Sequence, residues 1–237
     1  SKSGSGSGTV TSSPSGINCG GDCNEDVTDG TTVVLTASPA SSSNFTSWSG
    51  CDSTNGAECT IQMSSAKSPA ATFTLKTYSL SVSKDGTGDG TVTSSPSGIN
   101  CGGTCSASYD HGTEVTLTPT GDGTSIFTGW SGACTGSSSC VVTMSEARSV
   151  TATFARVTLS LTKSSRGTVT SNPAGISCAT GCLSASANFA PNTSVTLTAS
   201  GATVIVGTYS WGGACSGSST TCVVTMDQAK SVTITIT

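Results

Sequence analysis

Residues 8–21 read GTVTSSPSGINCGG, and residues 90–103 read the same fourteen letters. A looser third copy, GTVTSNPAGISC, occupies residues 167–178. Copies of one segment at a regular spacing are typical of tandem domains, each of which folds in the same way. The repeat therefore overrides the one or two domains that 237 residues would otherwise suggest.

The same period separates other landmarks of the chain. The tryptophans recur at almost the same spacing as the repeated segment, and so do the methionines; they are Trp48, Trp130, Trp211, Met63, Met144 and Met226. We place the domain junctions in short segments that are not rich in glycine or serine, which predicts stiff connections. The predicted domains are residues 1–77 (repeat one), 78–156 (repeat two) and 157–237 (repeat three).

Composition excludes several classes of protein. Only 9% of residues are charged, and nine Lys and Arg against thirteen Asp and Glu give a net charge of −4. Such a chain lacks the basic face that nucleic-acid binding requires. It also has no apolar run long enough to span a bilayer. Threonine and valine are abundant, which favours strands over helices.

Within each repeat the hydrophobic pattern has a period of two. Segments such as 80–82, 115–117 and 232–236 alternate Val, Ile or Leu with Ser or Thr, as expected of strands with one buried face. In repeat two this predicts strands near 79–83, 90–95, 105–109, 114–119, 126–130, 140–144 and 149–154, with a short helical turn possible at 145–148. The predicted fold class is all-β: three small antiparallel sandwich-like or barrel-like domains.

Disulfide bonds between cysteines are expected to compensate for the small hydrophobic cores of these domains. Each repeat carries four cysteines in the same order: Cys19, Cys23, Cys51 and Cys59; Cys101, Cys105, Cys134 and Cys140; and Cys178, Cys182, Cys215 and Cys222. Four cysteines allow three connectivities. We favour the local pairs, because their members are close in sequence and flanked by Gly or Ser, so that short loops can close. Disulfides imply an oxidising compartment, whereas a four-cysteine zinc site in each repeat is the weaker alternative.

The combined motifs resemble a known family. GTVTSSPSGINC, then FTGWSGAC at 127–134, CVVTM at 140–144 and SVTATF at 149–154 are similar to the divergent internalin-type B-repeats of bacterial surface proteins. Repeat two matches over its whole length, and repeats one and three match with departures, such as Thr208 where the other repeats have phenylalanine. The resemblance implies an extracellular, β-rich spacer or adhesion module and supplies no catalytic residues.

Candidate chemistry is sparse. His111 is the only histidine, and neither a nucleophile nor a second base accompanies it in the pattern. Asp110 and Glu114 fit a solvated face better than an acid pair. Asp85 and Asp89 in a glycine-rich segment resemble a calcium loop, although a hairpin turn explains the glycines equally well. We expect no catalytic residues, no resident metal and no cofactor.

The tryptophans and methionines are expected in the cores. One Trp per repeat, always shortly before a cysteine, fits packing on a disulfide better than an exposed platform for sugars. Asn44 and Asn192 lie in N-x-Ser/Thr patterns and are possible glycosylation sites.

The ends of the chain suggest a mode of assembly. Aligned on the GTV motif, Ser1 corresponds to Ser83, so repeat one starts after the position of the strand at 80–82 and has an open sheet edge. The last segment, 231–237, is uncharged and strongly β-prone, and it could complete an edge or reach the next subunit. The alternative to assembly is that the chain is a shortened piece of a longer surface protein.

We therefore expect a non-enzymatic, extracellular or cell-surface structural protein of bacterial origin. It would be the subunit of a surface filament or the shaft of an adhesin, with assembly head to tail by β-strand complementation. Its partners would be other copies of itself or a larger surface protein, without nucleic acid and without a membrane span. The alternative is a module that binds glycans or host proteins through loops near the three tryptophans.

Overall fold

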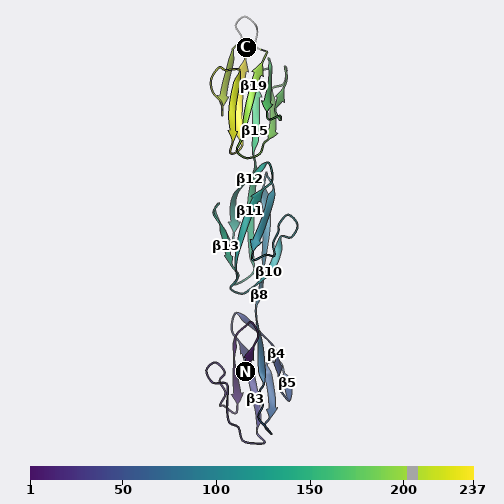
Figure 1. The fold of residues 1–237 in the computed structure, drawn as a ribbon, viewed down its shortest axis with the longest axis vertical. Helices are drawn as coiled ribbons and strands as arrows, with labels where there is room; N and C mark the ends of the chain where they lie inside the picture. The colour runs from purple at the N-terminus through teal and green to yellow at the C-terminus, as the bar shows by residue number, and fades with distance from the viewer. Residues whose placement is uncertain (202–207) are drawn as a thin grey trace. The chain divides into compact units, whose positions relative to one another are not determined.

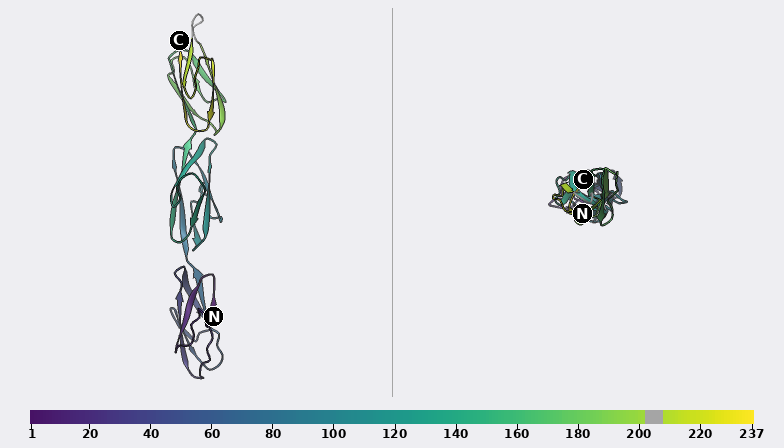
Figure 2. Two further views of the ribbon diagram at one scale, coloured as in Figure 1. Left: turned by 90° about the vertical axis from the view of Figure 1, so that its left-hand side faces the viewer. Right: turned by 90° about the horizontal axis from the view of Figure 1, so that it is seen from above.

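The computed structural model describes residues 1–201 and 208–237, and every regular element in these ranges is a β-strand (Figures 1 and 2). Residues 1–80, 108–114 and 143–148 form one compact unit, and residues 81–107, 115–142 and 149–237 form a second. The division into three domains stays a prediction, but the six sheets fall two to a repeat. No helix in the described residues could span a lipid bilayer.

Repeat one contains seven strands: β1 (Lys2–Ser3), β2 (Gly8–Ser13), β3 (Thr32–Pro39), β4 (Ser43–Ser49), β5 (Ser53–Asn55), β6 (Glu58–Gln62) and β7 (Ala70–Leu75). They form a three-stranded sheet of order β1-β7-β4 and a four-stranded sheet of order β2-β3-β6-β5. One hydrophobic cluster draws on both sheets, since it contains Val10 of β2, Leu35 of β3 and Phe73 of β7. Two sheets with one core between them are the sandwich that the alternating pattern predicts.

Repeat two contains the seven strands predicted for it, within a few residues: β8 (Thr77–Gly86), β9 (Gly90–Ser95), β10 (Ser106–Asp110), β11 (Glu114–Gly121), β12 (Ser125–Gly132), β13 (Cys140–Thr143) and β14 (Arg148–Arg156). Their sheets have the orders β10-β8-β14-β12 and β13-β11-β9. The helical turn considered at 145–148 is wrong: the chain bends at Ser145 and Glu146 and enters β14 at Arg148. Arg148 donates to the Ser145 hydroxyl, so the tight bend is closed without a helix.

Repeat three contains β15 (Thr158–Lys163), β16 (Thr168–Asn172), β17 (Ser177–Cys178), β18 (Ser184–Asn188), β19 (Thr193–Ser200), β20 (Tyr209–Gly213), β21 (Thr221–Met226) and β22 (Lys230–Ile236). Their sheets have the orders β18-β15-β22-β20 and β17-β16-β19-β21. Most of the pairings are antiparallel, but β15 runs parallel to β22, as β1 runs parallel to β7. In both repeats the first strand therefore lies beside the last strand of the same repeat.

The alternation decides which side chains form the core. In β22, Val232, Ile234 and Ile236 are buried, and the threonines between them are exposed. Successive side chains of a strand point to opposite faces, so an alternating segment buries one whole row. The X-Pro bonds at Pro14, Pro96 and Pro173 are all cis and lie in the turns that the sequence marks.

The last strand, β22 (Lys230–Ile236), is already paired within its own repeat. β22 pairs with β15 on one edge, with Leu161 opposite Val232, and with β20 on the other edge, with Trp211 opposite Ile234. A strand with both edges paired and its apolar row buried cannot complete another sheet while its own repeat stays folded. Of the two roles expected for residues 231–237, the strand completes a sheet of its own repeat, and the alternative that it reaches the next subunit is wrong.

Candidate functional site

The twelve cysteines form six local disulfides, two in each repeat. The pairs are Cys19–Cys23, Cys51–Cys59, Cys101–Cys105, Cys134–Cys140, Cys178–Cys182 and Cys215–Cys222, with Cα–Cα distances between 4.2 and 6.1 Å. No cysteine is left free. Each short bridge restricts the unfolded chain and is worth about 2 kcal/mol by loop entropy.

The tryptophan of each repeat donates a hydrogen bond to the loop that the second disulfide closes. In repeat two the indole Nε1 of Trp130 donates to the carbonyl oxygen of Ser138 at 3.0 Å, inside the loop bounded by Cys134 and Cys140. In repeat three Trp211 donates to Ser219 in the same way at 2.7 Å. The apolar ring packs inward while its one polar atom satisfies a loop carbonyl, which is the usual compromise for a buried indole.

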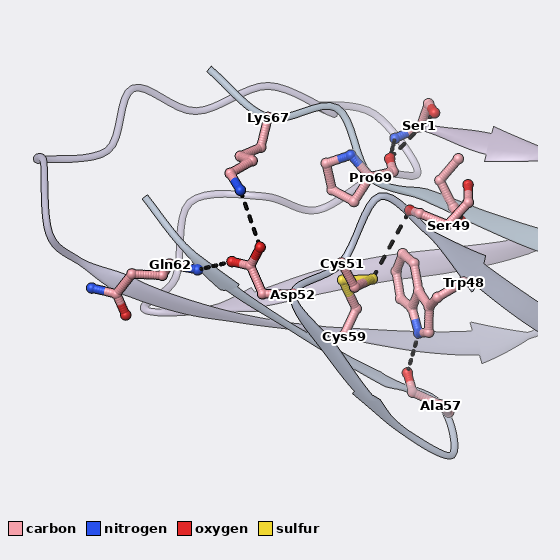
Figure 3. Close-up of a disulfide and its surroundings, with 11 residues drawn as sticks. Ser1, Trp48, Ser49, Cys51, Asp52, Ala57, Cys59, Gln62, Lys67 and Pro69 are labelled. Atoms are coloured by element: carbon pink, nitrogen blue, oxygen red, sulfur yellow. Dashed lines mark hydrogen bonds and ion pairs between the residues drawn. A yellow bond between two sulfur atoms is a disulfide. The ribbon is translucent and has the colours of Figure 1, made fainter. Parts of the chain in front are cut away.

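Repeat one has the same arrangement in a more exposed form. Trp48 donates to the carbonyl oxygen of Ala57 at 3.0 Å beside the Cys51–Cys59 bridge, as Figure 3 shows. Trp130 and Trp211 are only 5% and 6% exposed, whereas Trp48 is half-buried. Buried tryptophans cannot serve as flat platforms for sugars, so only Trp48 keeps part of its ring accessible.

The methionines differ between repeats in the same direction. Met144 and Met226 are fully buried, whereas Met63 is half-buried. Ile17 is likewise half-buried, although its equivalents Ile99 and Ile176 are buried. The core of repeat one is therefore open on one side.

A groove of about 340 Å³ lies at this opening. Its apolar lining includes Val10, Val33, Leu35, Trp48 and Met63, and Glu25, Asp26 and Lys67 are among the polar residues that border it. The volume is about twice that of a roughly 150 Å³ cavity made by a large-to-small core substitution.

One end of the groove is formed by the first residue. The Ser1 amino group donates to the carbonyl oxygen of Pro69 at 2.8 Å, and the Ala71 amide donates to the carbonyl oxygen of Ser1 at 3.0 Å. Figure 3 shows Ser1 beside Pro69, next to the disulfide and Trp48. These bonds start the parallel ladder of β1 on β7, in which Lys2 lies opposite Ala71.

The Asp52 carboxylate connects the Cys51–Cys59 loop to Lys67, which lines the groove. The Asp52 carboxylate accepts the backbone N–H of Gln62 at 2.6 Å and an N–H of the Lys67 ammonium at 3.1 Å (Figure 3). The hydrogen bond from the Gln62 amide, followed by the one from Lys67, lowers the pKa of Asp52 below its ordinary value. The contact ties the Cys51–Cys59 loop to the segment that leads into β7.

Other predicted chemistry does not come together in the structure. Asp110 and Glu114 are exposed. The His111 ring lies 5.9 Å from the Tyr78 ring, and its Nδ1 atom is buried without a hydrogen-bond partner. Within the described residues, no group of three or more His, Cys, Asp or Glu side chains is placed to hold a metal ion.

The calcium-like segment of repeat two is organised by a lysine. Asp89 accepts from the Lys84 ammonium at 2.6 Å, and this hydrogen bond, with one from the Gly90 amide, lowers the pKa of Asp89. The Asp85 carboxylate instead accepts the backbone N–H of Gly86. Lys84 also donates to the carbonyl oxygen of Gly90 at 2.8 Å, so the glycine-rich segment is a turn closed by an ammonium.

This lysine recurs in every repeat and was missed by the reasoning from sequence. Lys2 donates to the carbonyl oxygen of Gly8 at 2.9 Å, and Lys163 donates to those of Ser164 and Arg166. Lys163 is buried, and the loss of water around its ammonium lowers its pKa. Alignment of the three repeats could have revealed this shared lysine, because each one lies at or near the end of the first strand of its repeat.

The two glycosylation patterns lie on accessible positions. Asn44 is exposed in β4, and Asn192 is exposed with a positive φ of 64° just before β19. Both asparagines therefore remain candidates for glycan attachment.

Comparison with known proteins places these features in a family. A family model described as the divergent InlB B-repeat domain matches residues 2–77 and 80–158, about two thirds of the chain. Among curated proteins, none matches in sequence. Two solved structures are similar at low identity. The Bacillus anthracis TIE protein has 9% identity and a TM-score of 0.43, over 99% of this chain and 48% of that one. The major pilin T-13 of Streptococcus pyogenes has 10% identity and a TM-score of 0.32, over 68% of this chain and 96% of that one. The chain thus spans about half the length of the TIE protein.

Proposed function

The chain belongs to the divergent InlB B-repeat family, and from that membership we propose that it is a non-enzymatic structural segment of a bacterial surface protein. Six disulfides support an extracellular location, because such bonds persist in oxidising compartments. The fold fits a surface structural role, and it is all-β with a small disulfide-linked core in each repeat.

The observation that carries the proposal is the continuity from one repeat to the next. β7 ends at Leu75 and β8 begins at Thr77; β14 ends at Arg156 and β15 begins at Thr158. A connection of one residue leaves little freedom between consecutive strands, whereas a flexible tether needs many residues. A chain of repeats, each with two internal disulfides and with such short connections, suits a part that must resist extension and proteolysis outside the cell.

In its finer form, the proposal is that the chain is either the subunit of a surface filament or the shaft of an adhesin. In the filament, copies of the chain join head to tail through a contact that does not close on itself. In the shaft, the repeats act as spacers within a longer surface protein. We also propose the three domains at residues 1–77, 78–156 and 157–237.

Negative-stain electron microscopy of the native secreted material separates these forms. Fibres whose width matches one repeat support the filament, and single short particles attached to a larger protein support the shaft. Immunolabelling of intact cells with an antibody against repeat two tests the location. A native protein found inside the cell with reduced thiols would overturn the proposal.

The second candidate function is a binding module for glycans or host proteins. The half-buried ring of Trp48 in the groove favours it, because partly exposed aromatic rings stack on sugars. Screening a glycan array, with quenching of tryptophan fluorescence as the second readout, tests it. Quenching that persists in the Trp48→Phe variant would argue against this site.

A further inference from the structure

One sheet edge is covered in repeat one and open in the other two repeats. In repeat one, β5 pairs antiparallel with β6 and ends the sheet order β2-β3-β6-β5. The loop closed by the second disulfide is longest there, with a sequence separation of 8 against 6 and 7, and β5 forms within it. The equivalents of β6 are β13 and β21, which contain the last cysteine of their repeats. Each stands at the end of its sheet order, so no described strand covers it.

Both open edges present an exposed valine at the same position. Val141 and Val223 directly follow the last cysteine of their repeats and are 51% and 61% exposed. The equivalent Thr60, beside β5, is half-buried. In the described residues only three large hydrophobic side chains are exposed, and these valines are two of them. An aliphatic side chain on an unpaired edge invites another strand, and natural edges usually avoid it.

The backbone of β21 directs its free polar groups outward at the exposed valine. The Ala199 amide of β19 donates to the carbonyl oxygen of Thr220, just before β21. Hydrogen-bonded and non-hydrogen-bonded pairs alternate along an antiparallel ladder, so the residues of β21 at odd numbers do not bond to β19. The N–H and C=O groups of Val223 and Thr225, and the C=O of Thr221, therefore face away from the sheet.

The usual protections of an edge strand are not found in β21. Natural edges are blunted by charged side chains, proline or a bulge. The sequence of β21, TCVVTM, holds no charged residue and no proline, and its register on β19 runs without a shift from Thr221 to Met226. The Cys215–Cys222 disulfide also holds the start of the strand. β21 is therefore a fixed, uncharged edge, and a rigid edge loses less entropy when it pairs.

The edge of β13 is the poorer acceptor of the two. It has four residues, whereas β21 has six. The carbonyl oxygen of Thr143 in β13 already accepts the Ser145 amide at 3.1 Å. A strand added to β13 would therefore form fewer backbone hydrogen bonds than one added to β21.

We propose that β21 pairs antiparallel with β21 of a second copy of this chain, about a two-fold axis at Val223. The two valines then lie opposite each other and exchange both backbone hydrogen bonds, and each Thr225 amide donates to the Thr221 carbonyl oxygen of the other copy. The Thr221 amide, which already donates to the Ser219 hydroxyl, is not needed. Val223 of the second copy takes the place that Ser53 of β5 has opposite Thr60 in repeat one.

A second copy fits this edge because the edge is complementary to itself. The exposed valine of each copy covers that of the other, and threonines flank the pair on the same face. No charge within either strand opposes the approach. A two-fold contact closes after two chains, so it is distinct from the head-to-tail contact of a filament and goes beyond the proposed function. It applies equally to a filament subunit and to a shaft.

Analytical ultracentrifugation of the full oxidised chain should show a monomer–dimer equilibrium that depends on concentration. Val223→Lys should weaken the dimer at least about fivefold, because two ammonium groups then face each other and the valine contact is lost. Val223→Glu should weaken it in the same way. An equimolar mixture of the two variants should recover the dimer, because lysine then lies opposite glutamate. This recovery also excludes misfolding of either variant as the cause of the loss.

The matched control is Val141→Lys, which places the same charge at the equivalent position of β13 and should leave the dimer unchanged. Hydrogen exchange should show the amides of Val223 and Thr225 protected only in the dimer. A chain that stays monomeric up to its solubility limit, a dimer that survives Val223→Lys, or a mixture that recovers no dimer would overturn the proposal. Equal weakening by Val141→Lys would contradict the assignment to β21. A monomeric chain that captures another protein through Val223 would give the edge to that partner and overturn the second copy as its occupant.

Discussion

Removal of the second disulfide of repeat two should lower the stability of that repeat by about 2 kcal/mol, the value that loop entropy assigns to so short a closure at 25 °C. The perturbation is the double substitution Cys134→Ala and Cys140→Ala, which opens a loop with a sequence separation of 6. Both cysteines are buried, so lost packing adds to the entropic value and makes it a lower bound.

The loss is large for so small a domain. For a domain of about 80 residues, each kcal/mol corresponds to about 4–8 °C in melting temperature, so the transition of repeat two should fall by about 8–16 °C. The loop also holds the carbonyl oxygens of Gly136 and Ser138 that accept from the Trp130 backbone and indole. The fluorescence of Trp130 should therefore report the change.

Differential scanning calorimetry of the full chain measures the effect. The matched control is Cys51→Ala with Cys59→Ala, which opens the corresponding loop of repeat one and should lower a different transition. A variant that melts within about 3 °C of the parent, when mass spectrometry shows the parent fully oxidised, would refute the claim that the bridges stabilise these domains.

Three further outcomes are expected. Met144→Ala should cost about 2–5 kcal/mol in urea unfolding because the side chain is fully buried, whereas the equivalent Met63→Ala should cost clearly less; equal losses would contradict the open core of repeat one. Gly86→Ala should destabilise the chain by more than about 1 kcal/mol, since its φ of 100° is strained for alanine and the new Cβ would collide with a backbone carbonyl, whereas Gly103→Ala meets open space and serves as the control. The pKa of Asp52 is lower in the folded state, so its contribution to the free energy of unfolding is present above the unfolded pKa and is lost as pH falls through the folded pKa. In urea titrations at a series of pH values below about 5, Asp52→Asn should therefore lose less stability with falling pH than the parent. An unchanged dependence of stability on pH would contradict this reasoning.

Much of the fold could be predicted from the sequence because its signals are local. The alternation of Thr with Val and Leu predicts strands, since side chains alternate across a strand whatever lies beyond it. The local disulfide pairs were favoured among three connectivities because their cysteines are close in sequence, and the structure contains these pairs. The family could be identified from motifs that lie within one repeat.

The site could be predicted only in part. Trp48 and Met63 were expected in the core, and the structure adds that both are only half-buried and line a groove. The recurrent ammonium of Lys2, Lys84 and Lys163 was missed because its partners are backbone carbonyls, which carry no mark in the sequence.

The sequence by itself determined the repeat, the strands and the disulfide spacing, because each depends on residues near one another along the chain. Only the tertiary structure decided which strands are still free to pair. β22 looks like a free edge strand in its alternating sequence, yet it lies between β15 and β20. Edge and centre differ only in the neighbours that a strand acquires on folding, which its own sequence does not specify.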